Sequence, residues 1–461
     1  MAFVKGKECY FSNYVIFEEV CNNEYVLIHS YLNNIDIINE DVAKSLIKIK
    51  AGNNVDILEE ETFNQLFQKG YLVDDIDKDR ERFFKIADKL AQMKNKATSF
   101  IFIPSYDCNF SCPYCFEHEL TRNKDNKTMS KETVDAIFEV IKKQKADDQY
   151  ISLSMFGGEP LLKENIAINE YIFNNAKQTK LKLDVITNGY DLEHYFKFFK
   201  DGVFSNIQIT LDGGKEYHNN MKYAKDNKNT FDKIIHNIAS VLSIPGKFSI
   251  AIRINTNKDN IDSLLSLKET FETHGFLKDK RFNFYTKNVD ECKCRKSKEL
   301  SDVDIVHKIR FFDDNMKNMK TNSQFSHIIS EFEEIFDPKK KLGRYKVKYC
   351  GANENNQLID PLGDVYSCLE EVGKKDRRVG FLDMQNNKIV DTPLRKVWQN
   401  RLVQNIKECS VCKLSFICSG GCSIAALKYN GSLNKSYCAE INEICKEVIY
   451  EIVKGLTVDK I

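Results

Sequence analysis

The spacing of apolar residues divides the chain into two patterns that change near residue 96. Residues 1–95 hold two β-rich runs, "NYVIFEEV" and "EYVLIHSYLNNIDII", with Asn22–Asn23 as the turn of a hairpin between them. Two runs of helical periodicity follow, ending at Gly52 and Gly70, and a short strand comes next. This order predicts a small winged-helix-like module, which a helix over "KDRERFFKIADKLAQMKNK" connects to the rest of the chain.

From residue 96 to about 300, short apolar runs alternate with amphipathic helical segments. Six such repeats, from "TSFIFIP" to "RFNFYTKN", predict a parallel sheet covered by helices. Five strands end in unusual tails: a cysteine-rich loop, "GGEP", "TNG", "LDG" and "RINTN". Because ligands of parallel sheets bind at the carboxyl ends of the strands, these tails predict one site on a shared rim.

Composition and charge exclude several classes of protein. The 461 residues carry 68 Lys and Arg against 67 Asp and Glu, so a binding surface for nucleic acid or for a charged membrane is not indicated. No segment approaches the roughly 20 apolar residues of a membrane span. The N-terminus lacks the apolar core of a signal peptide. We therefore expect a soluble, cytoplasmic protein without a nucleic-acid or membrane partner.

Fifteen cysteines change this picture. In a long chain without a secretion signal, clustered cysteines are typical of metal binding or redox chemistry rather than of disulfides. The stretch "CNFSCPYC" holds Cys108, Cys112 and Cys115. A second group crowds the last quarter of the chain: Cys350, Cys368, Cys409, Cys412, Cys418, Cys422, Cys438 and Cys445.

Thiolates select zinc or iron–sulfur clusters. A structural zinc site has four ligands, which the first group reaches only if His118 joins it. A [4Fe–4S] cluster normally takes four cysteines, so three leave one iron open to a substrate or cofactor. The iron–sulfur interpretation is favoured because a zinc site leaves the strand-end tails unexplained.

The C-x3-C-x2-C spacing, with Tyr114 as the aromatic residue before the third cysteine, resembles the signature of radical S-adenosylmethionine (SAM) enzymes. The resemblance covers residues 98–290. It implies an α/β fold with a partial (β/α)6 TIM-barrel core. It also implies that the open iron of a [4Fe–4S] cluster on these three catalytic cysteines binds SAM, whose reductive cleavage gives a 5′-deoxyadenosyl radical.

The strand-end tails are similar to the SAM-binding motifs of the same family. The resemblance implies that Gly157 and Gly158 let the backbone approach SAM, and that the Glu159 carboxylate accepts from the SAM ammonium group. It further implies that Thr187, Asn188 and Arg253 contact the ribose and the carboxylate of SAM, since an Arg side chain donates bidentately to a carboxylate.

The last quarter resembles the seven-cysteine SPASM domain of peptide-modifying radical SAM enzymes. This implies two auxiliary [4Fe–4S] clusters, and thus three clusters in the chain. The implied ligands of the first are Cys409, Cys412, Cys418 and Cys438. The implied ligands of the second are Cys350, Cys368 and Cys422, with an open iron unless Cys292 or Cys294 completes the set. Cys445 is expected to be structural.

The resemblance assigns a role to each part of the chain. Residues 1–95 are expected to bind a leader peptide, 96–300 to form the radical SAM barrel, 301–345 to form a helical connector, and 346–461 to form the SPASM domain. The expected reaction is a thioether crosslink, from a Cys sulfur to a carbon of another residue, as in sactipeptide and ranthipeptide maturation. The expected partners are a ribosomally synthesised, cysteine-containing precursor peptide and a flavodoxin- or ferredoxin-type electron donor.

Other functions stay open. Within the same family they are carbon–carbon crosslinking, epimerisation, or sulfatase-type oxidation of Cys or Ser. The last is disfavoured because Leu369 follows Cys368 where the sulfatase-maturing branch has an aspartate. Outside the family, an iron–sulfur electron carrier or redox sensor and a zinc-binding interaction protein are the alternatives.

Overall fold

The computed structural model describes residues 8–21, 23–52, 55–93, 97–117, 128–147, 149–288, 345–438 and 440–458, with short pieces at 303–304, 320–321, 328 and 332. The chain divides into two compact units. The first comprises Met1–Lys94, Gln324–Cys350 and Gln399–Ile461, and the second comprises Asn95–Ser323 and Gly351–Trp398. Most of the predicted connector 301–345 lies outside the described residues.

The second unit is built on an eleven-stranded sheet whose centre is a row of six parallel strands. These are β6 (Ala97–Phe102), β7 (Tyr150–Met155), β8 (Leu183–Thr187), β9 (Phe204–Thr210), β10 (Ser249–Thr256) and β11 (Phe282–Asn288). They are neighbours in the sheet in their sequence order, as β/α repeats with right-handed crossovers require. The predicted partial (β/α)6 barrel is confirmed.

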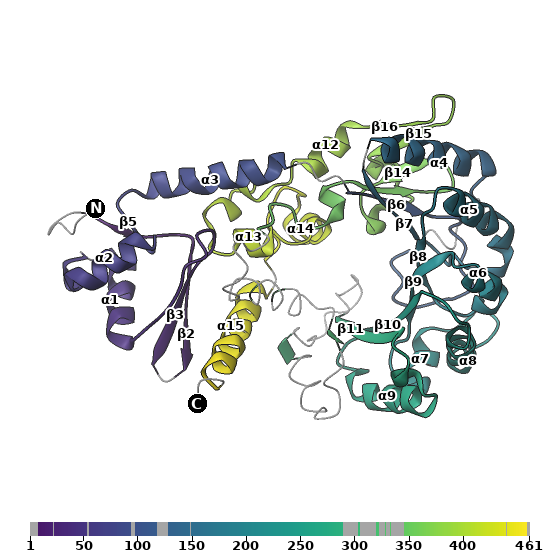
Figure 1. Ribbon diagram of the computed structural model, residues 1–461, viewed down its shortest axis with the longest axis horizontal. Coiled ribbons are helices and arrows are strands. Elements are labelled where there is room, and N and C mark those ends of the chain that lie inside the picture. The colour runs from purple at the N-terminus through teal and green to yellow at the C-terminus, as the bar shows by residue number, and fades with distance from the viewer. Residues whose placement is uncertain are drawn as a thin grey trace. The chain divides into compact units, whose positions relative to one another are not determined.

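Helices cover one face of this row, as Figure 1 shows. They are α4 (Lys131–Ala146), α5 (Ile166–Gln178), α6 (Phe196–Lys200), α8 (Phe231–Leu242) and α9 (Leu264–Thr273). The Ser130 side chain caps α4 by accepting a hydrogen bond from Thr133 N–H, whereas short 3-10 turns precede α5, α6 and α9. Helix α7 (Lys215–Met221), which the pattern did not predict, follows β9.

Residues from the cysteine-rich quarter extend the same sheet. Strand β13 (Asn356–Ile359) pairs with β6 in parallel, and β14 (Asp364–Tyr366), β15 (Gly380–Asp383) and β16 (Lys388–Asp391) continue antiparallel. The short strand β12 (Lys320–Thr321) pairs with β11 at the other end. Helix α12 (Pro393–Gln399) follows β16. The carboxyl ends of β6 to β10 therefore form part of one continuous sheet edge.

The first unit begins with a three-stranded antiparallel sheet in the order β2 (Val15–Cys21), β3 (Glu24–His29), β4 (Ile35–Ile38). The predicted hairpin is present as β2 and β3, but the third strand β4 was not predicted, because the second apolar run folds back on itself. A turn with Asn33 in the left-handed region is closed by a hydrogen bond of 2.9 Å from His29 N–H to Asn34 O. The predicted turn at Asn23 is present, also in the left-handed region.

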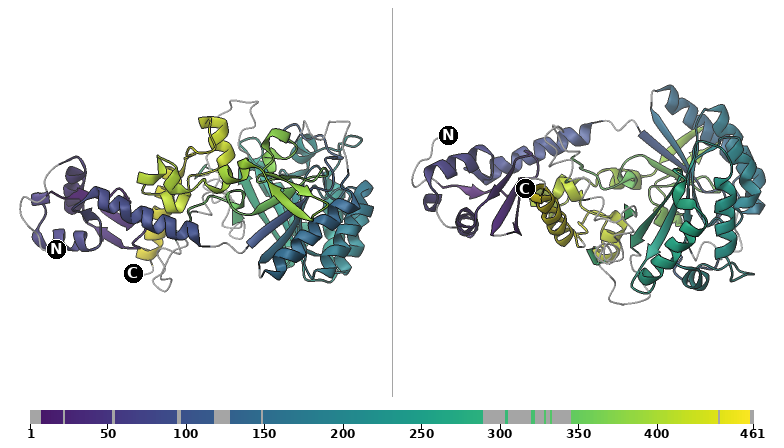
Figure 2. Two further views of the ribbon diagram at one scale, coloured as in Figure 1. Left: turned by 90° about the horizontal axis from the view of Figure 1, so that it is seen from above. Right: turned by 60° about the horizontal axis from the view of Figure 1, so that its bottom comes forward.

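The helices of this module follow the prediction. They are α1 (Glu40–Lys50), α2 (Glu60–Gln68) and α3 (Ile76–Gln92), and β1 (Tyr10–Phe11) pairs with β5 (Leu72–Val73). The side chains of Asn39 and Asp75 accept hydrogen bonds from the first turns of α1 and α3. The first unit also holds α13 (Ser415–Cys418), α14 (Ser423–Asn430) and α15 (Ile441–Val458), and α15 lies beside β2 (Figures 1 and 2). No helix among the described residues is long and apolar enough to cross a membrane.

One apolar core joins the N-terminal module to the C-terminal cysteine segment. Phe83 of α3 is fully buried, with its ring 4.8 Å from those of Tyr14 and Phe416, and Cys409 belongs to the same cluster. The Tyr14 hydroxyl donates to Ser410 O at 2.8 Å. The two segments therefore fold as one body.

Replacing Phe83 by alanine tests this shared core. We expect a loss of about 3–5 kcal/mol in the free energy of unfolding, because the cavity forms between three aromatic rings. Iron bound by the C-terminal cysteines is expected to fall as well. Thermal denaturation and iron analysis measure both effects, with Met93→Ala, at an exposed residue just after the end of the same helix, as control. If the variant lost stability but kept all its iron, the C-terminal cysteine segment would fold independently of the N-terminal module.

Candidate active site

The structure gathers the strand-end tails along one edge. Cys108, Cys112 and Cys115 lie on the loop after β6, and Gly157 and Gly158 follow β7. Thr187 ends β8, Asp212 follows β9, and Arg253 lies in β10. Since these five strands are parallel and adjacent, the tails meet as the sequence predicted.

The cysteine loop is fixed by backbone hydrogen bonds from two sides. Glu159 N–H donates to Asp107 O at 2.8 Å. On the other side, Ser111 N–H donates to Tyr223 O at 2.9 Å and Lys225 N–H donates to Asn109 O at 3.0 Å. A loop held in this way presents its thiols in a defined arrangement.

All three thiols interact electrostatically with a buried lysine that the sequence did not single out. Lys222 is 8% exposed, and its Nζ lies 3.9 Å from Cys112 Sγ. Burial raises the pKa of Cys108 and Cys112, and raises that of Cys115 to about 11, while Lys222 opposes the rise at each. Burial acts to lower the pKa of Lys222, but Cys112, Asp212 and the other two thiols raise it overall. Partly buried thiols near a buried ammonium group fit a thiolate-bound cluster.

The glycines of "GGEP" are needed where they stand. Gly157 and Gly158 have φ values of 92° and 48°. A Cβ at Gly158 would collide with the carbonyl oxygens of Tyr106 and Asp107, and one at Gly157 would meet the side chain of Ile103. Only glycine allows this approach of the β7 tail to the cysteine loop.

Glu159 braces this edge of the sheet. Its carboxylate, 2% exposed, accepts from the Thr187 hydroxyl and Asn188 N–H, both at 2.6 Å, and from Leu161 N–H at 2.9 Å. Burial raises its pKa to about 7. A ligand ammonium group would therefore meet a carboxylate that already has three protein donors.

Thr187 and Asn188 are likewise engaged with the protein. Besides its bond to Glu159, the Thr187 hydroxyl accepts from Gly189 N–H at 3.0 Å. The side-chain amide of Asn188 donates to Asn109 Oδ1 at 2.7 Å. Both side chains thus tie the β8 tail to its neighbours, and their predicted contact with SAM stays a prediction.

Tyr114, Asp212, Asn255 and Arg253 form one network across the tails of β6, β9 and β10. The Tyr114 hydroxyl donates to the Asp212 carboxylate, and Asn255 Nδ2 donates to its other oxygen at 3.2 Å. Arg253 Nε donates to Asn255 Oδ1 at 3.0 Å. Burial raises the pKa of Asp212, and the charge of Lys222 is the largest of the interactions that oppose this rise. The aromatic residue of the cysteine loop is thus anchored by a carboxylate.

A second buried carboxylate, Glu117, directly follows the cysteine loop and was also missed. Gly158 N–H donates to its Oε2 at 3.1 Å, whereas its Oε1 is buried without a hydrogen-bond partner. Burial raises its pKa to about 7. The sequence around Glu117 does not distinguish it from a solvent-exposed glutamate. Lys222 was missed for the same reason, because it lies in a charged stretch typical of the protein surface.

The first unit brings together a second set of thiols. Burial raises the pKa of both Cys409 and Cys418 to about 12, and each interacts electrostatically with Cys412 and Cys438. Leu414 N–H donates to Cys412 Sγ at 3.4 Å. The four residues predicted to ligate one auxiliary cluster are therefore neighbours in space.

Arg401 is a fully buried cation among these cysteines. Its guanidinium donates to the carbonyl oxygens of Leu433, Gly421, Gly420 and Lys435 at 2.5–3.0 Å. Burial lowers its pKa, and Cys409, Cys422 and Cys350 oppose this shift. Arg401 holds the "SGGC" turn in place, where a Cβ at Gly421 would collide with Tyr437 O.

The other predicted auxiliary set is not assembled within one unit. Cys350 and Cys422 belong to the first unit and Cys368 to the second, so their sharing of a cluster stays a prediction. Cys292, Cys294 and His118 lie outside the described residues. Within the described ranges, no three His, Cys, Asp or Glu side chains converge at the spacing of a single metal ion. A [4Fe–4S] cluster holds its thiolates further apart, because each binds a different iron.

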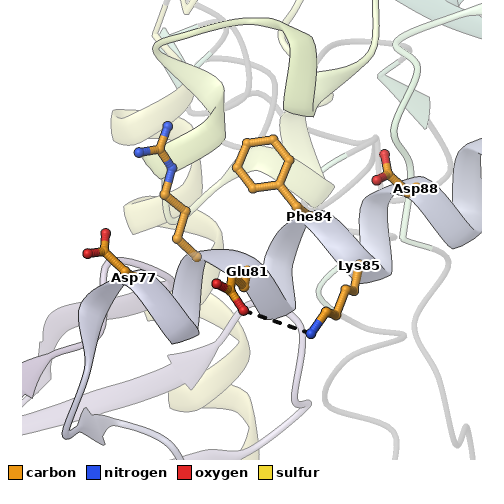
Figure 3. Close-up of a pocket in the computed structure, with 6 residues that line it drawn as sticks. Asp77, Glu81, Phe84, Lys85 and Asp88 are labelled. Atoms are coloured by element: carbon orange, nitrogen blue, oxygen red, sulfur yellow. Dashed lines mark ion pairs between the residues drawn. The ribbon is translucent and has the colours of Figure 1, made fainter.

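A pocket on α3 contains none of the predicted site residues. Figure 3 shows it lined by charged side chains and Phe84, with Glu81 and Lys85 paired at 3.9 Å. Exposed pairs of this kind are typical of a solvated helix face. The chemistry of this chain is thus expected at the two groups of thiols.

Comparisons with known proteins agree with this geometry. Residues 102–267 match the family model of the radical SAM superfamily. Among curated proteins, the chain is 23% identical to the radical SAM cyclopropyl synthase TigE of Paramaledivibacter caminithermalis over 93% of each chain. It is 24% identical to the cysteine-type anaerobic sulfatase-maturating enzyme of Clostridium perfringens, over 69% of this chain and 86% of that one.

Among solved structures, the fold is similar to that of Streptococcus suis SuiB bound to the precursor peptide SuiA. The TM-score is 0.55 at 15% identity, over 95% of this chain and 100% of SuiB. The matched segment 102–267 contains the cysteine loop, both glycines of "GGEP" and the buried Lys222. Residues 102–267 thus form a radical SAM domain.

Proposed function

We propose that this protein is a radical SAM enzyme that installs a thioether crosslink in a ribosomally synthesised peptide. The enzymatic part is supported by the three partly buried thiols that interact with the buried Lys222, and by the close approach of Gly158 to the cysteine loop. A [4Fe–4S] cluster on Cys108, Cys112 and Cys115 supplies, with SAM and an electron, a radical able to abstract hydrogen. The electron is proposed to come from a flavodoxin- or ferredoxin-type donor.

The residues around the thiols are proposed to shape the SAM site rather than to react. Gly157 and Gly158 let the backbone come close to the bound amino acid part of SAM. Glu159 keeps the tails of β7 and β8 together, and the Tyr114–Asp212 bond orients the cysteine loop. Arg253 is partly buried next to Asn255 and is proposed to contact the SAM carboxylate.

An auxiliary cluster is proposed on Cys409, Cys412, Cys418 and Cys438, supported by their mutual proximity. We expect Cys418→Ala to lose roughly four iron atoms per chain while the variant still forms 5′-deoxyadenosine from SAM. The buried Cys445, which interacts with Cys418 from α15, provides the control. Cys445→Ala is expected to keep its iron, and equal losses in both variants would contradict this ligand set.

A peptide substrate is supported by the N-terminal module and by the relatives. SuiB was solved bound to a precursor peptide, and the match with SuiB covers 95% of this chain. In the module, β4 is an outer strand of its sheet, and no other described strand pairs with its free edge. Residues 1–95 are proposed to bind a leader peptide as a strand added to this edge.

The formation of a thioether is the most specific part of the proposal. Two relatives are named for other reactions. TigE is a cyclopropyl synthase, and the Clostridium perfringens protein is a sulfatase-maturating enzyme. Against sulfatase-type oxidation, Glu371 near Cys368 is paired with Lys374 at 3.1 Å and Arg377 at 3.7 Å. Leu369 has no ionisable group at the position where the sulfatase-maturing branch has an aspartate.

The test uses the reconstituted, reduced enzyme with SAM and a short cysteine-containing precursor peptide. A thioether predicts loss of two hydrogens and of one thiol that iodoacetamide can alkylate. Loss of two hydrogens with every thiol intact indicates a carbon–carbon bond or oxidation of a serine. An unchanged mass together with a D-residue in the hydrolysed peptide indicates epimerisation. An electron carrier or a zinc protein would consume no SAM.

A further inference from the structure

We propose that Lys222 is the fixed counter-charge of the cluster on Cys108, Cys112 and Cys115, and that it raises the reduction potential of this cluster. The inference rests on the proposed iron–sulfur site and assigns a positioning residue to it. Lys222 is buried, and its Nζ lies 3.9 Å from Cys112 Sγ.

The segment that carries Lys222 is bound to the cysteine loop residue by residue. Phe110 and Ala224 form a β-bridge, flanked by the hydrogen bonds Ser111 N–H to Tyr223 O and Lys225 N–H to Asn109 O. Any shift of the loop would therefore move this segment as well. The ammonium and the thiols stay in register.

The backbone and side chain of Lys222 are held on their other sides too. Its N–H donates to His218 O at 2.7 Å, and its carbonyl accepts from the Thr230 hydroxyl at 2.6 Å. The ammonium group lies over the rings of Phe110 and Tyr114, at 5.9 and 6.0 Å from their centroids. A side chain so confined cannot swing out to solvent.

The charges around Lys222 explain why it is retained in a buried position. Cys108, Cys112, Cys115 and Asp212 all interact with it, so an isolated lysine in this place would be far less favourable. A cluster with three thiolate ligands becomes more negative by one charge when it is reduced. In a buried site a nearby cation stabilises the more negative state, which makes reduction easier.

The test is a redox titration of the reconstituted full-length enzyme, followed by electron paramagnetic resonance of the signal that changes when SAM is added. Lys222→Met is expected to lower the one-electron equilibrium constant at least tenfold, which is a shift of about 59 mV to lower potential. Lys222→Arg, which keeps the charge, is expected to stay near wild type. Lys225→Met, an exposed lysine on the same segment, is the matched control.

Each outcome decides the question. An unchanged potential in Lys222→Met overturns the inference. If Lys222→Met fails to load iron while Lys222→Arg loads fully, the charge requirement is supported. If both fail, Lys222 is a packing residue and the inference is wrong. If wild type itself has no SAM-sensitive signal, it is the proposed function that fails instead.

Discussion

Replacing Cys112 by alanine is expected to abolish formation of 5′-deoxyadenosine from SAM, with a loss of at least about 100-fold. Cys112 is the thiol nearest to Lys222, and its removal leaves two ligands and an ammonium group without its closest partner. The iron lost is expected to be that of one cluster, roughly four atoms per chain. Chromatography of 5′-deoxyadenosine after reduction with dithionite measures the activity.

Cys9→Ala is the control for this variant, since Cys9 is a partly buried residue packed on the core of the N-terminal module. It is expected to keep both iron and activity. If Cys112→Ala and wild type formed comparable amounts of 5′-deoxyadenosine, the cysteine loop would not be the site of SAM cleavage.

Ile37→Lys is expected to weaken binding of the precursor peptide about tenfold, or 1.4 kcal/mol. Ile37 is 50% exposed on the outer strand β4, and a lysine on an edge strand opposes the addition of another strand. Cleavage of SAM without peptide is expected to be unchanged. Fluorescence anisotropy of the labelled peptide measures the affinity.

A matched control is Ile57→Lys, which changes an isoleucine of similar exposure, 45%, outside the sheet. Equal affinity of Ile37→Lys and wild type would remove β4 from the binding surface. A point substitution is sharper than deletion of residues 1–90, because Tyr14, Tyr31 and Phe83 share a core with Cys409. The deletion would disturb the auxiliary cysteines whatever the module binds.

The repeating part of the fold could be predicted from the sequence because its signals are local. Each strand of the row β6–β11 is a short apolar run, and Gly70 and Asn23 adopt the left-handed backbone that their turns require. The pairing of β13 with β6 could not be predicted. It joins residues more than 250 positions apart, and Asn356–Ile359 is too short to show a period.

The site divides in the same way. The thiols and glycines follow from their spacing, which the chemistry of the cluster constrains. Lys222 and Glu117 carry no such pattern, because a lone Lys or Glu in a charged stretch is usually solvated. Only the packing of α7 and of the cysteine loop shows that both are buried. The contact of Glu159 with the SAM ammonium group stays a prediction, and the structure adds that three protein donors already reach its carboxylate.

The most direct test of the central claim is the mass of the 5′-deoxyadenosine formed when the reduced enzyme acts on a perdeuterated precursor peptide in ordinary water. The account predicts product that is heavier by one deuterium, because the hydrogen is taken from a peptide carbon. Unlabelled 5′-deoxyadenosine formed alongside a modified peptide would contradict it.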